Sequence, residues 1–390
     1  MNLASGMAVS SRPSMPSSES WNREGLPGWS YRSERILELE KERVFLTHWH
    51  VVGHANDIPE PGDWLSFDLL GERALVIRGK DGTIRAFQNT CRHRGSRLVE
   101  GDKGHCRGAL LCPFHAWVYT LEGQLKTPSQ PDKFPALDPS EWSLQVLDLE
   151  EWRGFLFLRF EPGPQGSVAS LMARHEKELE IYPLETLQPA SGFYTSPIQE
   201  VNWKAMVDVD NECYHCPSAH PGLTDLYGKG YEEGPWLDGT HRIRGPFNQT
   251  PSRQELNQRY RALVEQHPSP FSALPQAWLY IGLFPSSVLV FYPESAGFYR
   301  SIPLSTTQSV MNGADYSYAN ESESMKQARD IATDINDIVL KEDKHICALH
   351  YQATASKYWH QGYFGDSEKA LREHHDKLRS LIPELEGNRI

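Results

Sequence analysis

Two short segments that each pair a cysteine with a histidine constrain this chain more than any other feature. The first is Cys91-Arg92-His93, and the second, after eighteen intervening residues, is Cys112-Pro113-Phe114-His115. Glycine and proline, which favour turns, stand within or beside these segments. Thiolates and imidazoles bind metals, and lone core residues do not recur in two such compact units. The sequence therefore predicts a metal centre.

The spacing of these ligands bears on which metal they bind. Zinc sites usually pair Cys with Cys and His with His, whereas each segment here supplies one of each. A mixed [2Fe–2S] cluster needs this pattern, because two cysteines hold one iron and two histidines hold the other. Zinc remains the alternative. The runs Cys-Arg-His-Arg-Gly-Ser and Cys-Pro-Phe-His-Ala-Trp closely resemble the Rieske oxygenase family. The resemblance implies that Cys91 and Cys112 bind the inner iron, and His93 and His115 the outer one.

Length, charge and the first residues limit the class of protein. A chain of 390 residues is expected to form about two or three domains. A formal net charge of −12 argues against a nucleic-acid partner, and no apolar run is long enough to span a bilayer. The Ser- and Pro-rich start lacks the features of a secretion signal, so residues 1–25 are expected to be a disordered leader of a cytoplasmic protein. In that compartment the cysteines outside the cluster are expected to be thiols.

Hydrophobic patterning predicts an α+β fold. Ser33 can cap a helix that runs to about residue 48. The N-terminal segment, residues 26–46, is expected to pack as a helix on the catalytic domain. Alternating runs at 64–69, 74–78, 84–89, 116–121 and 155–160 predict an antiparallel β domain over residues 47–160 that holds the cluster. A turn-rich linker at 161–167 follows. Strands at 278–284, 288–292 and 297–302 and helices at 323–353 and 367–381 predict a catalytic domain, residues 161–390, with an antiparallel sheet.

A second group of ligand-type residues lies in the segment from Asn211 to His220. His215 and His220 are separated by four residues, and a His-x4-His spacing alone is a weak signal. In a chain that already carries an electron-transfer cluster the signal becomes stronger. Two histidines and one carboxylate form the triad that holds non-haem Fe(II) and leaves positions open for O2. Cys213 and Cys216 could form a redox dithiol, but we expect them to be packing residues.

The family resemblance also covers this second segment, through Asn202-Trp203-Lys204 and Glu212-Cys-Tyr-His215. It implies that His215 and His220 bind the mononuclear iron and that Glu212 bridges the two metal sites. The third iron ligand must be a later carboxylate. The resemblance favours Asp343, because Gln352 follows it by nine residues as in the family, with Glu342 as the alternative.

A reaction follows from the two metal sites together. An iron that binds O2 beside an electron carrier predicts an oxygenase that attacks a substrate C–H bond or an arene. No Gly-x-Gly-x-x-Gly motif is present, so the electrons must come from a separate NAD(P)H-dependent reductase of the flavin or ferredoxin type. The resemblance extends from about residue 26 to 381, and it implies a homotrimer in which the cluster of one subunit faces the iron of the next.

The substrate is the part on which the sequence says least. The Glu-Cys-Tyr-His-Cys run resembles the choline, carnitine and betaine group, which implies hydroxylation or N-demethylation of a small quaternary ammonium compound. Aromatic side chains and a carboxylate could surround such a cation; the candidates are Asp208, Trp278, Tyr280 and Phe291. An aromatic acid bound by Arg242, Arg244 or Arg253 is the rival substrate. A pure electron-transfer protein is the third possibility.

Overall fold

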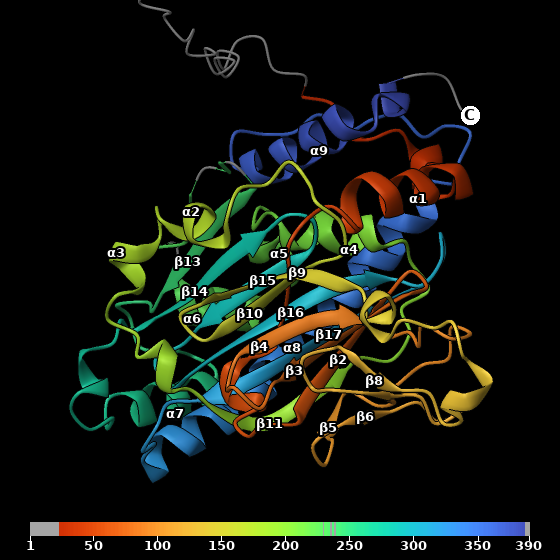
Figure 1. Cartoon of the computed structure of the whole chain (residues 1–390). Helices are drawn as coiled ribbons and strands as arrows, with labels where there is room; N and C mark the ends of the chain where they lie inside the picture. Colours follow the sequence, from red (N-terminus) through yellow and green to blue (C-terminus); the bar gives the residue numbers. More distant parts are fainter. Residues whose placement is uncertain (1–22, 229, 235, 238, 387–390) are drawn as a thin grey trace, which may run out of the picture.

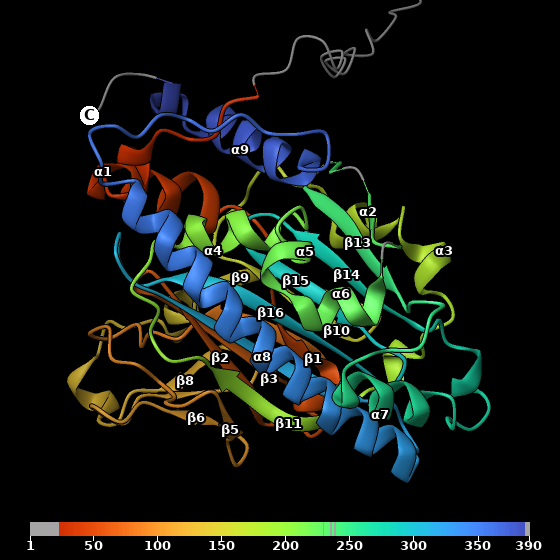
Figure 2. The same cartoon turned by 180° about the vertical axis from the view of Figure 1, so that it is seen from behind.

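The computed structural model describes residues 23–228, 230–234, 236–237 and 239–386. Of the expected leader, residues 1–25, the first 22 lie outside the described residues. Gly25 is described, and its N–H donates to the Gly362 carbonyl at 3.0 Å. Two large antiparallel sheets form the centre of the molecule, and helices cover one face of the second sheet (Figures 1 and 2). The predicted α+β fold class is confirmed.

The first sheet contains the strands before residue 160, in the order β1-β10-β9-β4-β3-β2-β5. Its strands are β1 (His50–His54), β2 (Asp63–Leu69), β3 (Glu72–Arg78), β4 (Ile84–Gln88), β5 (Lys103–His105), β9 (Val146–Trp152) and β10 (Phe155–Arg159). A small three-stranded sheet, β6 (Leu110–Leu111), β7 (Val118–Tyr119) and β8 (Leu125–Thr127), follows the second cysteine–histidine segment. The strand expected at 116–121 is reduced to β7, because Ala116 adopts φ +53° and Thr120 begins a turn.

The second sheet has the order β11-β17-β16-β15-β14-β13-β12. Its strands are β11 (Gln188–Thr195), β12 (Glu232–Glu233), β13 (Thr240–Pro246), β14 (Ala277–Leu283), β15 (Ser287–Phe291), β16 (Ser295–Pro303) and β17 (Ser309–Ser317). Because side chains alternate along a strand, its two faces carry different cores. Leu279 and Phe291 pack toward β1 and β10 of the first sheet, whereas Trp278 and Tyr292 pack toward helices.

The helices gather mainly on that second face. They are α1 (Glu34–Glu40), α2 (Val168–Met172), α3 (Glu176–Leu179), α4 (Trp203–Asp210), α5 (Cys216–Ala219), α6 (Pro221–Tyr227), α7 (Glu255–Val264), α8 (Glu323–Ala353) and α9 (Lys369–Leu381). The long helix α8 crosses the back of the sheet and contacts α4 to α7 (Figure 2). No helix of the described residues is long and apolar enough to cross a membrane.

The N-terminal helix differs in part from the prediction. Ser33 caps it as expected, since its Oγ accepts the Ile36 N–H at 3.3 Å. The α-helical geometry ends at Glu40 and a π-helical turn, Lys41–Phe45, follows. This change leaves Glu40 fully buried against α4, where it accepts hydrogen bonds from Lys204 Nζ at 2.5 Å and Trp203 Nε1 at 2.7 Å. The helix thereby joins the catalytic half of the chain, next to α9 (Figure 1).

Candidate metal centres

The two cysteine–histidine segments fold into equivalent loops. In each loop the cysteine N–H donates to the carbonyl five residues later, and the cysteine carbonyl accepts the N–H four residues later. The residue at that fourth position has a positive φ in both loops, +73° at Gly95 and +53° at Ala116. The repeated turn presents the side chains of both segments to the same space.

The four predicted cluster ligands lie together at the tips of these loops. Cys91 and Cys112 are buried free thiols, and the rings of His93 and His115 lie 4.6 Å apart between centroids. Trp117 stacks on His93 at 4.9 Å. Within the described residues, His93 Nδ1 is buried without a hydrogen-bond partner. Such an atom is costly unless it binds something, so two sulfurs and two imidazoles fit a [2Fe–2S] cluster.

The predicted iron ligands also converge. His215 and His220 come from the segment between α4 and α6, and Asp343 comes from α8. Their ligand atoms all lie within 4.8 Å of one another, with His220 Nε2 at 2.9 Å and His215 Nε2 at 3.7 Å from Asp343 Oδ1. Burial alone would raise the pKa of Asp343, but its contacts with the two histidines lower that pKa below its usual value. Three donors around one point fit a mononuclear iron.

Each of these two histidines also meets a glutamate on the other side of its ring. His215 Nδ1 lies 2.5 Å from Glu212 Oε1, and His220 Nδ1 lies 2.8 Å from Glu342 Oε2. Glu342 is therefore behind His220, whereas the adjacent Asp343 faces the triad. The sequence could not distinguish these neighbours on α8, and it gave no sign that Glu342 orients a ligand.

Cys213 and Cys216 form a disulfide, so the prediction that they are thiols was wrong. The chain turns between Glu212 and α5, and this turn brings the two Cα atoms to 5.0 Å, within the range that a disulfide needs. The prediction rested on the expected reducing environment of the cytoplasm, and that argument takes no account of how close the local turn brings the two cysteines. Cys106 and Cys347 are free thiols, as expected. The disulfide encloses the iron-ligand candidate His215.

The predicted substrate-binding residues are not brought to one place. Asp208 is buried and contacts Tyr31 Oη at 2.5 Å, His375 Nε2 at 2.8 Å and His350 Nε2 at 3.2 Å. Burial opposes its ionisation, yet these histidines hold the pKa of Asp208 well below its usual range. The negative charge of Asp208 is therefore already paired with histidines of the fold and is not available to a cationic substrate. Phe291 packs on the opposite face of the sheet from Trp278.

Trp278 and Tyr280 belong to a cluster of aromatic side chains on the helix-covered face. Trp278 stacks on Tyr292 at 4.3 Å and donates to Tyr260 Oη at 2.7 Å, so it is mainly a core residue. Tyr280 Oη contacts Tyr227 Oη at 3.2 Å and accepts a hydrogen bond from Tyr292 Oη at 3.4 Å. Their hydroxyl groups bring polar atoms into an otherwise apolar region next to α6 and α8.

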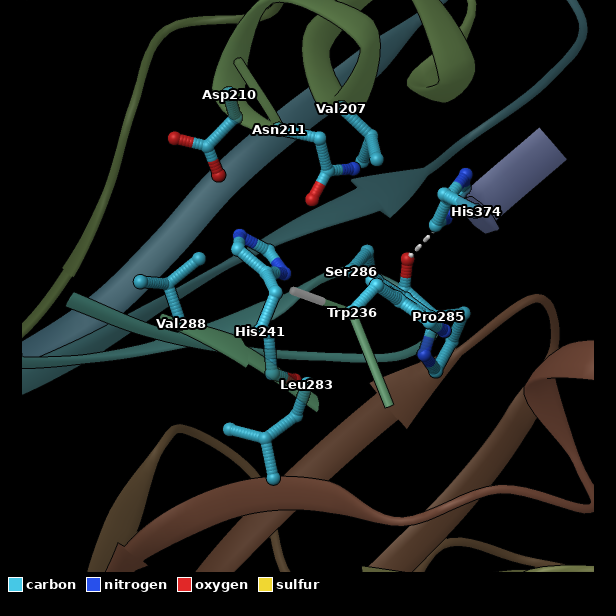
Figure 3. Close-up of a pocket in the computed structure, with 11 residues that line it drawn as sticks. Val207, Asp210, Asn211, Trp236, His241, Leu283, Pro285, Ser286, Val288 and His374 are labelled. Carbon is cyan, nitrogen blue, oxygen red and sulfur yellow. Dashed lines mark hydrogen bonds between the residues drawn. The ribbon is translucent and has the colours of Figure 1, made fainter. Parts of the chain in front are cut away.

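A residue that the sequence reasoning passed over, Asp210, lies at the end of α4 beside a small cavity (Figure 3). Tyr299 Oη donates to its Oδ1 at 2.6 Å, and burial raises the pKa of Asp210 to about 7. Asn211 and His241 line the same cavity, whose volume of about 10 Å³ is enough for roughly one water molecule. Three acidic residues in close succession, Asp208, Asp210 and Glu212, were the only signal in the sequence.

Comparisons with known proteins agree with this two-centre arrangement. Residues 173–384 match the family model of the ring-hydroxylating alpha subunit (catalytic domain), and residues 48–142 match that of the Rieske [2Fe–2S] domain. The two matches imply a Rieske cluster and a mononuclear iron.

Individual relatives point to the same group. The chain is 34% identical over 208 residues to the carnitine monooxygenase oxygenase subunit of Escherichia coli (strain K12), covering 53% of this chain and 54% of that protein. It is 32% identical over 247 residues to the glycine betaine monooxygenase oxygenase subunit of Chromohalobacter salexigens, covering 63% and 52%. The chain thus spans about half the length of these curated relatives.

A solved structure shows that the fold is shared over nearly the whole chain. The crystal structure of a quaternary ammonium Rieske monooxygenase in complex with L-carnitine matches with a TM-score of 0.74 at 23% identity. The match covers 92% of this chain and 95% of that one. Because the catalytic-domain model alone accounts for more than half of the residues, the chain belongs to the family of ring-hydroxylating alpha subunits, with a Rieske [2Fe–2S] domain ahead of its catalytic domain.

Proposed function

We propose that this chain is an oxygenase component that uses O2 and externally supplied electrons to hydroxylate a small quaternary ammonium compound of the betaine type. The observation that carries the proposal is the convergence of His215, His220 and Asp343 in a chain that also has a cluster-binding domain. Hydroxylation of an N-methyl carbon gives an unstable carbinolamine that releases formaldehyde. The net outcome at such a carbon is N-demethylation.

The ligand residues proposed for the cluster are Cys91, His93, Cys112 and His115, and those for the iron are His215, His220 and Asp343. When bound, the cluster supplies electrons one at a time and the iron supplies an open position for O2. Glu212 and Glu342 accept the Nδ1 protons of His215 and His220, which leaves each Nε2 free to bind metal.

Glu212 has a second proposed role. In a trimer of the family type it accepts a hydrogen bond from His115 of the partner subunit as well as from His215, and so gives the electron a short route between the centres. Its position supports this role, since Glu212 is hydrogen-bonded to the backbone N–H and the Nδ1 of His215, on the side of that ring away from Asp343.

The substrate class is supported by the names of the relatives and by the site. Carnitine and glycine betaine are both quaternary ammonium compounds. Tyr280 and Asp210 offer an aromatic ring and a carboxylate on the side of the sheet where Asp343 lies. Two of the three arginines suggested for an aromatic acid are less available, because Arg242 pairs with Glu178 at 2.5 Å and Arg244 with Glu232 at 3.3 Å.

The remaining parts of the proposal concern partners and location. A separate NAD(P)H-dependent reductase supplies the electrons, and the oxygenase assembles as a trimer in the cytoplasm. We propose that residues 47–160 and 161–390 separate the two tasks, electron transfer and oxygen activation. This division is supported by the two sheets, which lie on either side of residue 160 in the sequence.

A single-turnover experiment tests the function. The purified protein, loaded with both metals, is reduced chemically, exposed to O2, and offered betaines, carnitine, choline and a set of aromatic acids in parallel. Formaldehyde or a hydroxylated product from the ammonium compounds is expected. Product from the aromatic acids alone would replace the proposal with an arene hydroxylase or O-demethylase. Oxidation of the cluster without any product would favour an electron-transfer protein.

A further inference from the structure

A second cavity, larger than the one near Asp210, lies between the two sheets, and its lining includes none of the residues proposed as metal ligands. Its volume is about 190 Å³, far above the roughly 10–15 Å³ that one water molecule needs. Strand β2 and the loop at 97–102 form one wall, and β11, β16 and β17 form the other. Its lining includes Phe67, Asp68, Asp102, Thr195, Arg300 and Asn312.

Arg300 forms the deep end of this cavity. The residue is only 3% exposed, and its guanidinium lies over the rings of Phe67 at 4.2 Å and Phe298 at 5.3 Å. Its Nε donates to Asn312 Oδ1 at 2.6 Å, and its Nη1 donates to the Val51 carbonyl of β1. No described residue accepts a hydrogen bond from Nη2. A nearly buried cation therefore has one donor nitrogen uncommitted where it lines the cavity.

The charge of Arg300 has no direct partner among the described residues. No carboxylate forms an ion pair with it, and burial lowers the pKa of Arg300 to about 9. Asp102 acts on it only at longer range, and Asp68 is already paired with Arg97. Both acids are exposed, so they lie at the rim rather than beside the guanidinium. A buried charge that lacks a counter-ion is unfavourable unless a ligand or solvent supplies one.

Other donors face the same space. The amide nitrogen of Asn312 and the hydroxyl of Thr195 make no hydrogen bond to a described residue, while Asn312 Oδ1 accepts one from Arg300. Thr195, Asn312 and Arg300 are in register on neighbouring strands, so their side chains lie on the same face of the sheet. The inner part of the cavity thus offers hydrogen-bond donors and a positive charge. The aromatic rings of Phe67 and Phe193 supply apolar walls. Asp102 at the rim disfavours an anion with two or more charges more strongly than it disfavours a singly charged one.

We propose that this cavity is a binding site for a small organic monocarboxylate. Its carboxylate accepts hydrogen bonds from Arg300 Nη2 and the Asn312 amide, and its remaining atoms point past the aromatic walls toward the acidic rim. A carboxylate is favoured because it suits a guanidinium in a charge-assisted bond. Since Arg300 already connects β16 to β1, a ligand on it also stabilises the junction of the two sheets. Nothing in this site depends on the proposed reaction.

Calorimetric titration and thermal unfolding of the metal-loaded protein test the proposal, with acetate as the probe and chloride and phosphate at matched ionic strength. Acetate is expected to bind and to raise the unfolding temperature in a concentration-dependent way, because it binds only the folded state. Neither chloride nor phosphate is expected to match it. Equal effects of acetate and chloride would overturn the site, and a larger effect of phosphate would overturn the ligand class.

Variants show where the probe binds. Asn312→Asp places a carboxylate against the Arg300 guanidinium and should weaken acetate binding at least tenfold. Asn320→Asp makes the same charge change at an exposed turn and should leave binding unchanged. Thr195→Val, which removes only a hydroxyl from the wall, should weaken binding severalfold and serves if Asn312→Asp does not fold. Acetate bound to the iron would be insensitive to both cavity variants, and that result would refute the proposal.

Discussion

Replacing Glu342 by Gln tests how the fold holds the proposed iron. The substitution keeps the size of the side chain but removes the charge that accepts the His220 Nδ1 proton at 2.8 Å. Hydrogen bonds to charged groups contribute about 1.5–3 kcal/mol. The Glu342 side chain is 28% exposed, so solvent screens part of this interaction and we expect about 1.5–2 kcal/mol. That energy corresponds to roughly 10–30-fold weaker iron binding, since about 1.4 kcal/mol is a factor of ten.

The assay is competition for Fe(II) against a chelator of known affinity, with iron and cluster quantified separately. Asp337→Asn is the matched control, because it removes the same charge from an exposed position of the same helix and should not alter iron affinity. Asp343→Asn should abolish iron binding, as expected for a ligand. Wild-type affinity in Glu342→Gln would refute the orienting role. A complete loss of iron in Glu342→Gln, with iron retained in Asp343→Asn, would exchange the two roles.

Three further predictions concern the cluster, a buried ion pair and a buried acid. Cys112→Ser should abolish the visible absorption of the cluster, whereas Cys106→Ser should retain it. Lys204→Met should lower the free energy of unfolding by about 3 kcal/mol, because it leaves Glu40 buried and unpaired, and adding Glu40→Gln should recover part of the loss in denaturant titrations. Burial raises the pKa of Glu294 to about 8, above its unfolded value, so the wild type should lose stability relative to Glu294→Gln as pH rises from 5 to 8; parallel curves would contradict this.

Both metal centres could be proposed from the sequence because most of their candidate ligands lie in short, recognisable segments. Local turns shape the loops around Cys91 and Cys112 and the segment that carries His215 and His220, and nearby residues determine those turns. Asp343 was harder, since α8 offers several carboxylates and only its packing against the His215 segment selects one. The family spacing to Gln352 compensated for this.

The features that the sequence did not reveal depend on contacts between distant segments. Asp208 is an acidic residue that could bind a cationic substrate. In the structure, however, its carboxylate contacts His350 and His375, which lie far along the chain. Asp210 and its partner Tyr299 are brought together by the packing of α4 on β16. The Cys213–Cys216 disulfide was missed for a different reason. It depends on a local turn, but the prediction followed the general rule that cysteines of cytoplasmic proteins are thiols.

The different origins of the two ligand sets have a consequence for how the protein matures. All four proposed cluster ligands belong to one stretch, residues 91–115, within the part of the chain that forms the first sheet, so they can gather once the chain up to about residue 160 has folded. The proposed iron ligands join residues 215–220 to α8, and the long loop of chain between them must be closed before they meet. Cluster insertion can therefore precede completion of the chain, whereas iron can enter only after α8 has docked. A variant in which α8 detaches should accordingly stay coloured while it loses iron, and iron content would measure how completely the last part of the fold has assembled.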